Sequence, residues 1–172
     1  MARRVVITGI GVITSIGIGV RHFAAALREG KSGITRSVSY LNEGFDCHYL
    51  GEIKGFDPDR WIVNQDASNL CKAGKFAVAA ARMAIEDAGI GQDTLKEGTG
   101  GVCIGTTDGE EAVIEELMQH AFGHERDINP LYIRNTSPIE IAGAIAREFQ
   151  LQGEVMTVTT ACAAGNYAVG YG

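Results

Sequence analysis

Runs of β-branched apolar residues alternate along the chain with longer stretches of helical periodicity. Strand-like runs occupy residues 4–12, 100–107 and 155–160, and a possible short edge strand occupies 49–53. Apolar residues at helical spacing mark 20–30, 66–88, 110–121 and 137–149. Strands that alternate with helices favour a mostly parallel sheet covered by helices on both faces. The pattern therefore predicts an α/β fold.

The longest predicted helix, residues 66–88, has one face of small side chains. Asp66 is typical of an N-cap, and Gly89 is typical of the residue that follows a helix. Small side chains allow a neighbouring segment to approach closely, so we expect tight packing along this face. Alanines recur on it at spacings of three and four residues, at Ala73, Ala77, Ala80, Ala84 and Ala88.

A proline marks the start of the next long helix. Ser137, Pro138 and Glu140 form the pattern of a capping box with proline at the first helical position. The helix continues to about Phe149 and is expected to bury Ile141, Ala142, Ile145 and Phe149. The preceding residues, 128–134, show no clear periodicity and are predicted to be irregular.

The strand at 155–160 is followed directly by small residues around Cys162. This places the thiol at a strand-to-helix junction, on or beside the first turn of a helix. The unpaired N–H groups and the positive dipole end of such a turn favour an anion, which makes a thiolate more available. Cys162 is therefore a candidate nucleophile. The alternative is a small buried core residue, since free cysteines are often buried.

The helix predicted at residues 162–172 is apolar on nearly all sides and has no charged face. A helix of this kind is normally buried on all sides. As the last predicted element it lacks a partner to bury it. We therefore expect the chain to be part of something larger, or to pack against a second chain.

Composition narrows the class of protein. The 172 residues suit one domain, and 45% of them are hydrophobic. The net charge of −6 and the absence of a dense basic run argue against nucleic-acid binding. No apolar run is long enough to cross a membrane, and no signal-peptide plan is present, so we expect a cytoplasmic protein. The four cysteines form no CxxC pair and are expected to be free thiols: Cys47, Cys71, Cys103 and Cys162.

Two motif interpretations fail on spacing. Thr14 and His22 stand where a dinucleotide-binding motif that begins at Gly9 or Gly17 requires its third glycine. The glycines fit tight turns and close packing better. His120 and His124 are four residues apart, but Gly123 lies between them and no HExxH pattern is present. We expect no metal site.

Five segments, in order, resemble the N-terminal half of a β-ketoacyl-[acyl-carrier-protein] synthase, an elongating condensing enzyme of the thiolase superfamily. One such segment alone would be weak evidence for the family, but five in the right order are strong evidence. Together they extend over nearly the whole chain. They are residues 3–12, 28–34, 84–89, 104–109 and the nucleophile motif Thr160-Ala161-Cys162-Ala163-Ala164-Gly165.

The resemblance implies a thiolase-like fold, with the full enzyme layered αβαβα, and a covalent mechanism. Cys162 would accept an acyl group from an acyl carrier protein as a thioester. A malonyl carrier protein would then decarboxylate, and its carbanion would attack that thioester and extend the chain by two carbons. The backbone N–H of Cys162 would supply one oxyanion-hole donor. No cofactor and no metal are implied.

The resemblance also implies that catalytic groups lie elsewhere. The family uses two histidines and a lysine from its C-terminal half, and the histidines of this chain do not match those positions. We therefore expect residues 1–172 to be the N-terminal part of a ketosynthase that cannot condense alone. Expected partners are acyl- and malonyl-loaded carrier protein and the C-terminal half. The assembly would be a homodimer or a ketosynthase/chain-length-factor heterodimer.

Departures from the family pattern suggest a specialised substrate. Asp108 stands where the family often has an apolar residue near the acyl pocket, and a carboxylate there is costly unless paired or turned away. Residues 129–140 resemble the stretch that reaches toward the partner's pocket, which makes Ile133 and Arg134 substrate-binding candidates. An ion pair between Asp108 and Arg134 is a further hypothesis. Together these features favour an unsaturated or polyketide-type acyl group.

The family's basic helix start is also altered, because Ala67, Ser68 and Asn69 carry no charge. Cations available to dock a carrier protein are Arg60, Lys72 and Lys75, although the two lysines also fit an ordinary solvated face. Two alternative functions remain open: a non-catalytic chain-length-factor-like subunit, which usually lacks the nucleophile, and a thiolase acting on coenzyme A esters.

Overall fold

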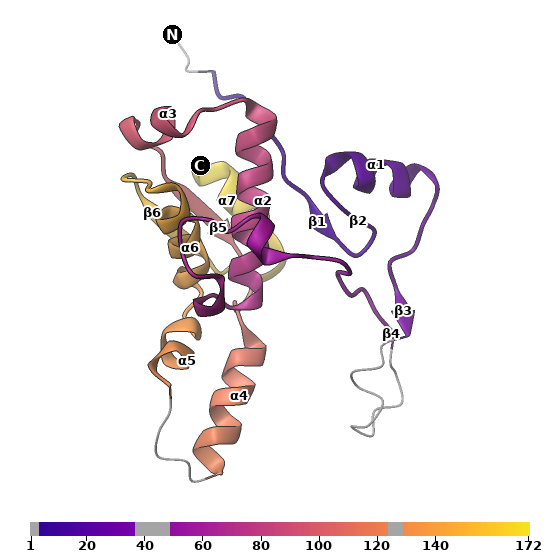
Figure 1. The fold of residues 1–172 in the computed structure, drawn as a ribbon, viewed down its shortest axis with the longest axis vertical. Helices are drawn as coiled ribbons and strands as arrows, with labels where there is room; N and C mark the ends of the chain where they lie inside the picture. Colours follow the sequence, from indigo (N-terminus) through magenta and orange to yellow (C-terminus); the bar gives the residue numbers. More distant parts are fainter. Residues whose placement is uncertain (1–3, 37–48, 124–128) are drawn as a thin grey trace. The chain divides into compact units, whose positions relative to one another are not determined.

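The structure is a computed structural model that describes residues 4–36, 49–123 and 129–172 (Figure 1). The chain divides into two compact units. Unit 1 comprises Met1–Asp57 and Ala80–Gly89, and unit 2 comprises Pro58–Ala79 and Ile90–Gly172. The predicted Cys47 thiol and His124 lie outside the described residues.

Among its described residues, unit 1 contains two short antiparallel strand pairs, one whole helix and the second half of the long helix described below. β1 (Ile13–Thr14) pairs with β2 (Gly17–Ile18), and β3 (Thr35–Arg36) pairs with β4 (Tyr49–Leu50). The helix α1 (Val20–Arg28) confirms the predicted helix at 20–30. Gly30, at φ 65°, provides the left-handed residue that ends it.

The prediction of a buried strand at residues 4–12 is wrong for this structure. None of these residues is in a strand, and Val5 and Ile7 are 88% and 79% exposed. A strand needs a neighbour for its backbone N–H and C=O groups. Among the described residues β1 and β2 pair only with each other, so this segment keeps strand-like composition without strand pairing.

The predicted close packing on the alanine face of the long helix is confirmed within unit 1. A side chain on Gly11 would overlap the carbonyl oxygen of Ala80, and one on Gly9 would lie 2.7 Å from the backbone nitrogen of Ala88. Asp87 accepts a hydrogen bond from the N–H of Ile10 at 3.0 Å. The glycines therefore serve close packing, as the failed dinucleotide spacing indicated.

The long helix α2 (Lys72–Ala88) ends where predicted, with Gly89 at φ 66°, but it begins later. Asp66 caps a separate 3₁₀ turn, η2 (Ala67–Asn69), by accepting from the N–H of Ser68 at 2.8 Å. Leu70 then adopts an extended conformation, which interrupts the helix before Lys72. The 3₁₀ turn η1 (Pro58–Arg60) precedes this region.

Unit 2 is built on one parallel strand pair. β5 (Val102–Gly105) pairs with β6 (Val155–Val158), with Gly105 opposite Val158. The crossover between them contains α4 (Glu111–Phe122), α5 (Pro130–Asn135) and α6 (Ile139–Phe149). The parallel pairing confirms the α/β prediction. α3 (Gln92–Glu97) precedes β5, and η3 (Ala161–Ala163) and α7 (Ala164–Tyr171) follow β6.

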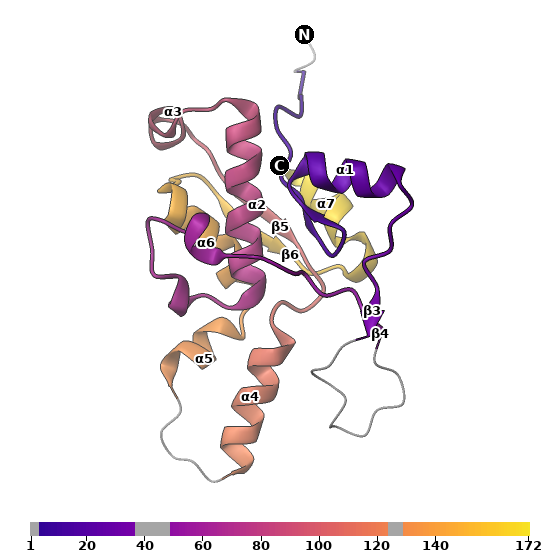
Figure 2. The same ribbon diagram turned by 45° about the vertical axis from the view of Figure 1, so that its right-hand side comes forward.

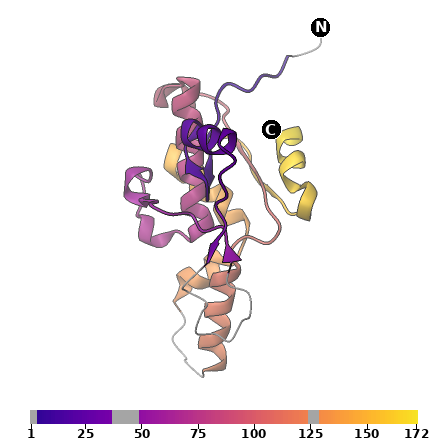
Figure 3. The same ribbon diagram turned by 90° about the vertical axis from the view of Figure 1, so that its right-hand side faces the viewer.

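Helices cover both faces of this strand pair. Both α6 and α7 contact the pair, and Figure 3 shows them on opposite sides of it. α6 buries the four apolar residues predicted for it, including Ile141 and Phe149. α4 and α5 lie side by side beyond the strand pair (Figure 2).

Two local predictions in the crossover are wrong. Residues from Pro130 form the helix α5 rather than an irregular segment, because Asn129 caps it by accepting from the N–H of Leu131 and Pro130 suits the first turn. The capping box at Ser137 does not form. No side chain caps α6, and Glu140 instead forms ion pairs with arginines.

Candidate active site

Cys162 lies in the turn between β6 and α7, as the sequence predicts. The strand ends at Val158, and η3 carries the cysteine directly before the helix begins at Ala164. The residue is exposed and its thiol is free, as are the thiols of Cys71 and Cys103. The alternative of a buried core cysteine therefore does not hold at this position in the structure.

The backbone turns sharply just before the cysteine. Ala161 has φ 48°, in the left-handed region that costs a residue with a side chain about 1 kcal/mol. The N–H of Ala163 donates to the carbonyl of Thr160 at 3.1 Å and closes the turn. A small residue at Ala161 limits the steric cost of this conformation, and the turn leaves Cys162 open to solvent.

The outer face of α7 is exposed and apolar. Tyr167 and Tyr171 stack with ring centroids 6.3 Å apart, and Val169 is 75% exposed. A shallow hollow of about 310 Å³ is lined by Asn166, Tyr167, Gly170 and Tyr171. Only Ala164 of this helix is fully buried. The apolar surface predicted for this helix is therefore exposed to solvent in this chain.

Asp108 follows the carboxyl end of β5, just as Cys162 follows that of β6. Parallel strands place their carboxyl ends at one edge of a sheet, which is where α/β proteins commonly bind ligands. Asp108 is exposed there. The next residue, Gly109, has φ 98°, and a side chain on it would lie 3.3 Å from Pro138 at the start of α6. The turn that carries Asp108 is thus held against α6.

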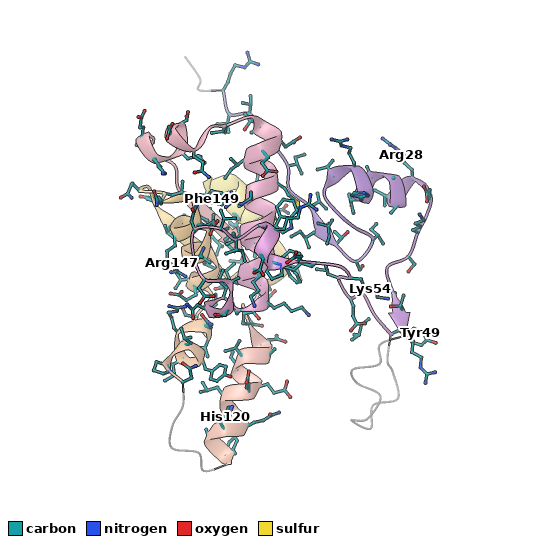
Figure 4. The ribbon with its side chains drawn as sticks, in the orientation of Figure 1. Arg28, Tyr49, Lys54, His120, Arg147 and Phe149 are labelled. Atoms are coloured by element: carbon teal, nitrogen blue, oxygen red, sulfur yellow. The ribbon has the colours of Figure 1, made fainter. Side chains whose placement is uncertain are left out.

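Ile133 and Arg134 are neighbours on α5, and Ile133 is 58% exposed. The hypothesis of an Asp108–Arg134 ion pair is wrong. Arg134 instead lies 3.4 Å from the carboxylate of Glu140 and donates to the carbonyl of Asn69 at 3.1 Å. A carboxylate on the adjacent helix is the closer partner. Arg147 on α6 (Figure 4) also contacts Glu140, at 2.9 Å.

The three candidate docking cations all lie in unit 2. The guanidinium of Arg60 stands 4.8 Å from the ring centroid of Trp61, a cation–π contact. Lys72 is exposed at the start of α2, and Lys75 is half-buried. Lys72 and Lys75, on the first turns of one helix, are three residues apart and share a face.

Sequence reasoning missed a buried carboxylate beside the start of α2. Glu110 is 7% exposed and accepts a hydrogen bond from the N–H of Ala73. Burial of Cys71, together with the nearby Glu110 carboxylate, raises the pKa of that thiol to about 11. Glu110 thus caps α2 from a distant part of the chain, and Cys71 remains protonated. No local pattern signals such a contact.

Metal and membrane-spanning features are not found within the described residues. No cluster of three metal-ligating side chains occurs there. His120 instead stacks on Tyr132 at 5.8 Å, near the carboxylate of Glu116 (Figure 4). No described helix is long and apolar enough to cross a membrane.

Comparison with known proteins decides the family. The model of the N-terminal domain of β-ketoacyl synthases matches residues 2–171. The chain belongs to the β-ketoacyl synthase family. It spans 41% of the length of a 3-oxoacyl-[acyl-carrier-protein] synthase 2 from Vibrio cholerae, to which it is 29% identical over 170 residues covering 98% of the chain.

Two solved structures of ketosynthases share the fold. The ishigamide ketosynthase/chain length factor is 43% identical with a TM-score of 0.90, covering 97% of this chain and 42% of that one. The complex AntDE:AntF, a type II polyketide acyl-carrier protein with its ketosynthase bound to the hexaketide, is 26% identical with a TM-score of 0.75. It covers 99% of this chain and 41% of that one. The thiolase-like α/β fold is thereby established.

Proposed function

We propose that this chain carries the acyl-accepting half of a β-ketoacyl-[acyl-carrier-protein] synthase, with Cys162 as its nucleophile. The observation that supports this most is the exposed Cys162 in the turn between β6 and α7, in a chain that belongs to the family. The thiolate attacks the carbonyl carbon of an acyl carrier thioester, the carbon–sulfur bond to the carrier breaks, and the carrier leaves as its thiolate. The backbone N–H of Cys162 donates to the oxyanion that develops.

The second step forms the carbon–carbon bond. Malonyl carrier protein loses carbon dioxide, and the resulting carbanion attacks the Cys162 thioester, which releases the thiolate and a chain two carbons longer. Splitting acyl transfer from condensation is the gain of a covalent intermediate. We propose that decarboxylation needs groups supplied by the remaining part of a ketosynthase. The chain's share of about two fifths of its relatives' length supports this.

The acyl group is proposed to be polyketide-type or unsaturated rather than the saturated acyl chain of bulk fatty acid synthesis. Asp108 would lie near the acyl chain, and Ile133 and Arg134 would reach a pocket of a second subunit. The exposed position of Ile133 on α5 and the likeness to AntDE:AntF, a type II polyketide ketosynthase bound to the hexaketide, support this assignment.

Acyl carrier protein is the proposed macromolecular substrate. Arg60, Lys72 and Lys75 would offer positive charge to an acidic carrier on a chain whose net charge is −6. The AntDE:AntF complex is a carrier protein bound to a ketosynthase, which supports a carrier as partner. The proposed assembly is a homodimer or a ketosynthase/chain-length-factor heterodimer.

A non-catalytic chain-length-factor-like role is the second candidate, because one similar structure is a ketosynthase/chain length factor. The presence of Cys162 favours the catalytic role. The discriminating experiment loads the complete ketosynthase with an acyl carrier and maps the modified residue. A thioester at Cys162 that is lost in Cys162→Ala is expected. Modification only at other cysteines, or none, would exclude the catalytic assignment.

A further inference from the structure

The first turn of α7 lies directly against β5 at Gly105. A Cβ atom on Gly105 would overlap the carbonyl group of Ala164 and would lie 2.7 Å from the backbone nitrogen of Gly165. Side chains do not approach backbone atoms so closely, so only glycine permits this contact. The facing residue, Ala164, is 2% exposed. Helix and strand therefore meet here through backbone atoms.

Gly105 also contacts the other end of the nucleophile turn. In the parallel ladder it stands opposite Val158, the last residue of β6, and the N–H of the adjacent Thr106 donates to the carbonyl of Val158 at 3.1 Å. The chain thus leaves the sheet at Val158, opposite Gly105, and returns to pack on Gly105 at Ala164. The five residues between these two points, 159–163, include Cys162. One residue of β5 fixes both ends of the segment that carries the thiol.

We propose that Gly105 is a positioning residue for Cys162. This inference rests on the proposed function, since it concerns the same nucleophile. Any side chain at residue 105 pushes the Ala164 carbonyl and the first turn of α7 away from β5 while Val158 stays in the ladder. The turn that holds Cys162 is then stretched, and the thiolate loses the alignment with the helix start that favours an anion.

The test measures the rate at which iodoacetamide alkylates each cysteine of the chain, by peptide mapping at fixed pH. The variant is Gly105→Ala. The matched control is Gly101→Ala, because a Cβ on Gly101 would also meet backbone, 2.6 Å from the carbonyl oxygen of Glu154, at the opposite end of the same strand pair. Both variants strain the same ladder, and only one touches the nucleophile turn.

Gly105→Ala is expected to slow alkylation of Cys162 about fivefold, the factor that loss of a helix-terminus interaction with an anion produces. Gly101→Ala is expected to leave that rate unchanged. A merely loosened fold would instead speed alkylation of the half-buried Cys103 and leave Cys162 as fast or faster. Equal Cys162 rates in the wild-type chain and Gly105→Ala, or equal slowing in both variants, would overturn the inference.

A milder variant covers the case in which Gly105→Ala does not fold. Ala164→Ser adds one atom to a buried residue whose backbone carbonyl meets Gly105, and it is expected to slow the alkylation of Cys162 as well. Unchanged reactivity there would also count against positioning. The proposed function is tested separately by acyl loading: a Cys162 that is alkylated in the chain but never acylated in the complete ketosynthase would remove the function and leave the geometric result standing.

Discussion

The carboxylate of Glu148 accepts a hydrogen bond from the backbone N–H of Val63 at 2.8 Å, across 85 positions of sequence. Glu148 is fully buried on α6, and it also accepts from the N–H of Asn64 at 3.2 Å and the side-chain amide of Gln65 at 3.1 Å. The carboxylate therefore satisfies three donors of the segment that precedes α2.

Replacing Glu148 by alanine is expected to lower the free energy of unfolding by about 3 kcal/mol, because buried N–H groups would lose their acceptor. Glu148→Gln keeps one acceptor oxygen and should lose less. Urea unfolding measures both. Arg147→Ala, one residue away and partly exposed, is the control and should change little. A Glu148→Ala variant as stable as Arg147→Ala would contradict the role given to this carboxylate.

Glu110→Ala is expected to destabilise the protein by about 1–2 kcal/mol, the range for loss of a helix cap. The carboxylate accepts from the N–H of Ala73 in the first turn of α2, and alanine at residue 110 removes that acceptor. The neighbouring exposed residue, in Glu111→Ala, serves as the control in the same unfolding experiment. Equal stabilities of the two variants would show that the cap contributes nothing.

Stability should fall in alkaline solution because of Cys71. Its pKa is raised from 9.0 to about 11 in the folded protein, so the folded state holds the thiol proton more tightly than the unfolded state does. The stabilisation is complete below pH 9 and is lost as pH rises through about 11. Unfolding at pH 8 and pH 10.5 measures the loss, and Cys71→Ala should reduce it. An identical alkaline loss in the variant would refute the assignment.

Asp108→Leu is expected to shift the acyl preference of the complete ketosynthase toward long saturated chains, because it removes a carboxylate that is costly beside an alkyl group. Competition between saturated and polyene acyl carriers for Cys162 measures the preference. Asp108→Asn removes the charge but keeps the shape of the side chain. It therefore separates the effect of the charge from the effect of the side chain's size and polarity. A wild-type preference for long saturated carriers, or no shift in either variant, would count against a role for Asp108.

Local patterns in the sequence determined much of this protein. The small-residue run after 155–160 located the turn that carries Cys162. The spacing of alanines predicted a closely packed helix face, and the structure shows that Gly9 and Gly11 pack on it. Both depend on short-range geometry, since a strand, a turn and a helix each leave a periodic or compositional signal. The order of motifs then identified the β-ketoacyl synthase family.

Tertiary structure decided what local patterns do not encode. Residues 4–12 have the composition of a strand, yet a strand needs a second strand to pair with, and no described strand pairs with this segment. The choice of Glu140 over Asp108 as the partner of Arg134 depends on which helices lie side by side. Glu110 and Glu148 are buried because distant N–H groups converge on them. The packing of the turn that carries Cys162 against Gly105 likewise exists only once β5, β6 and α7 have come together.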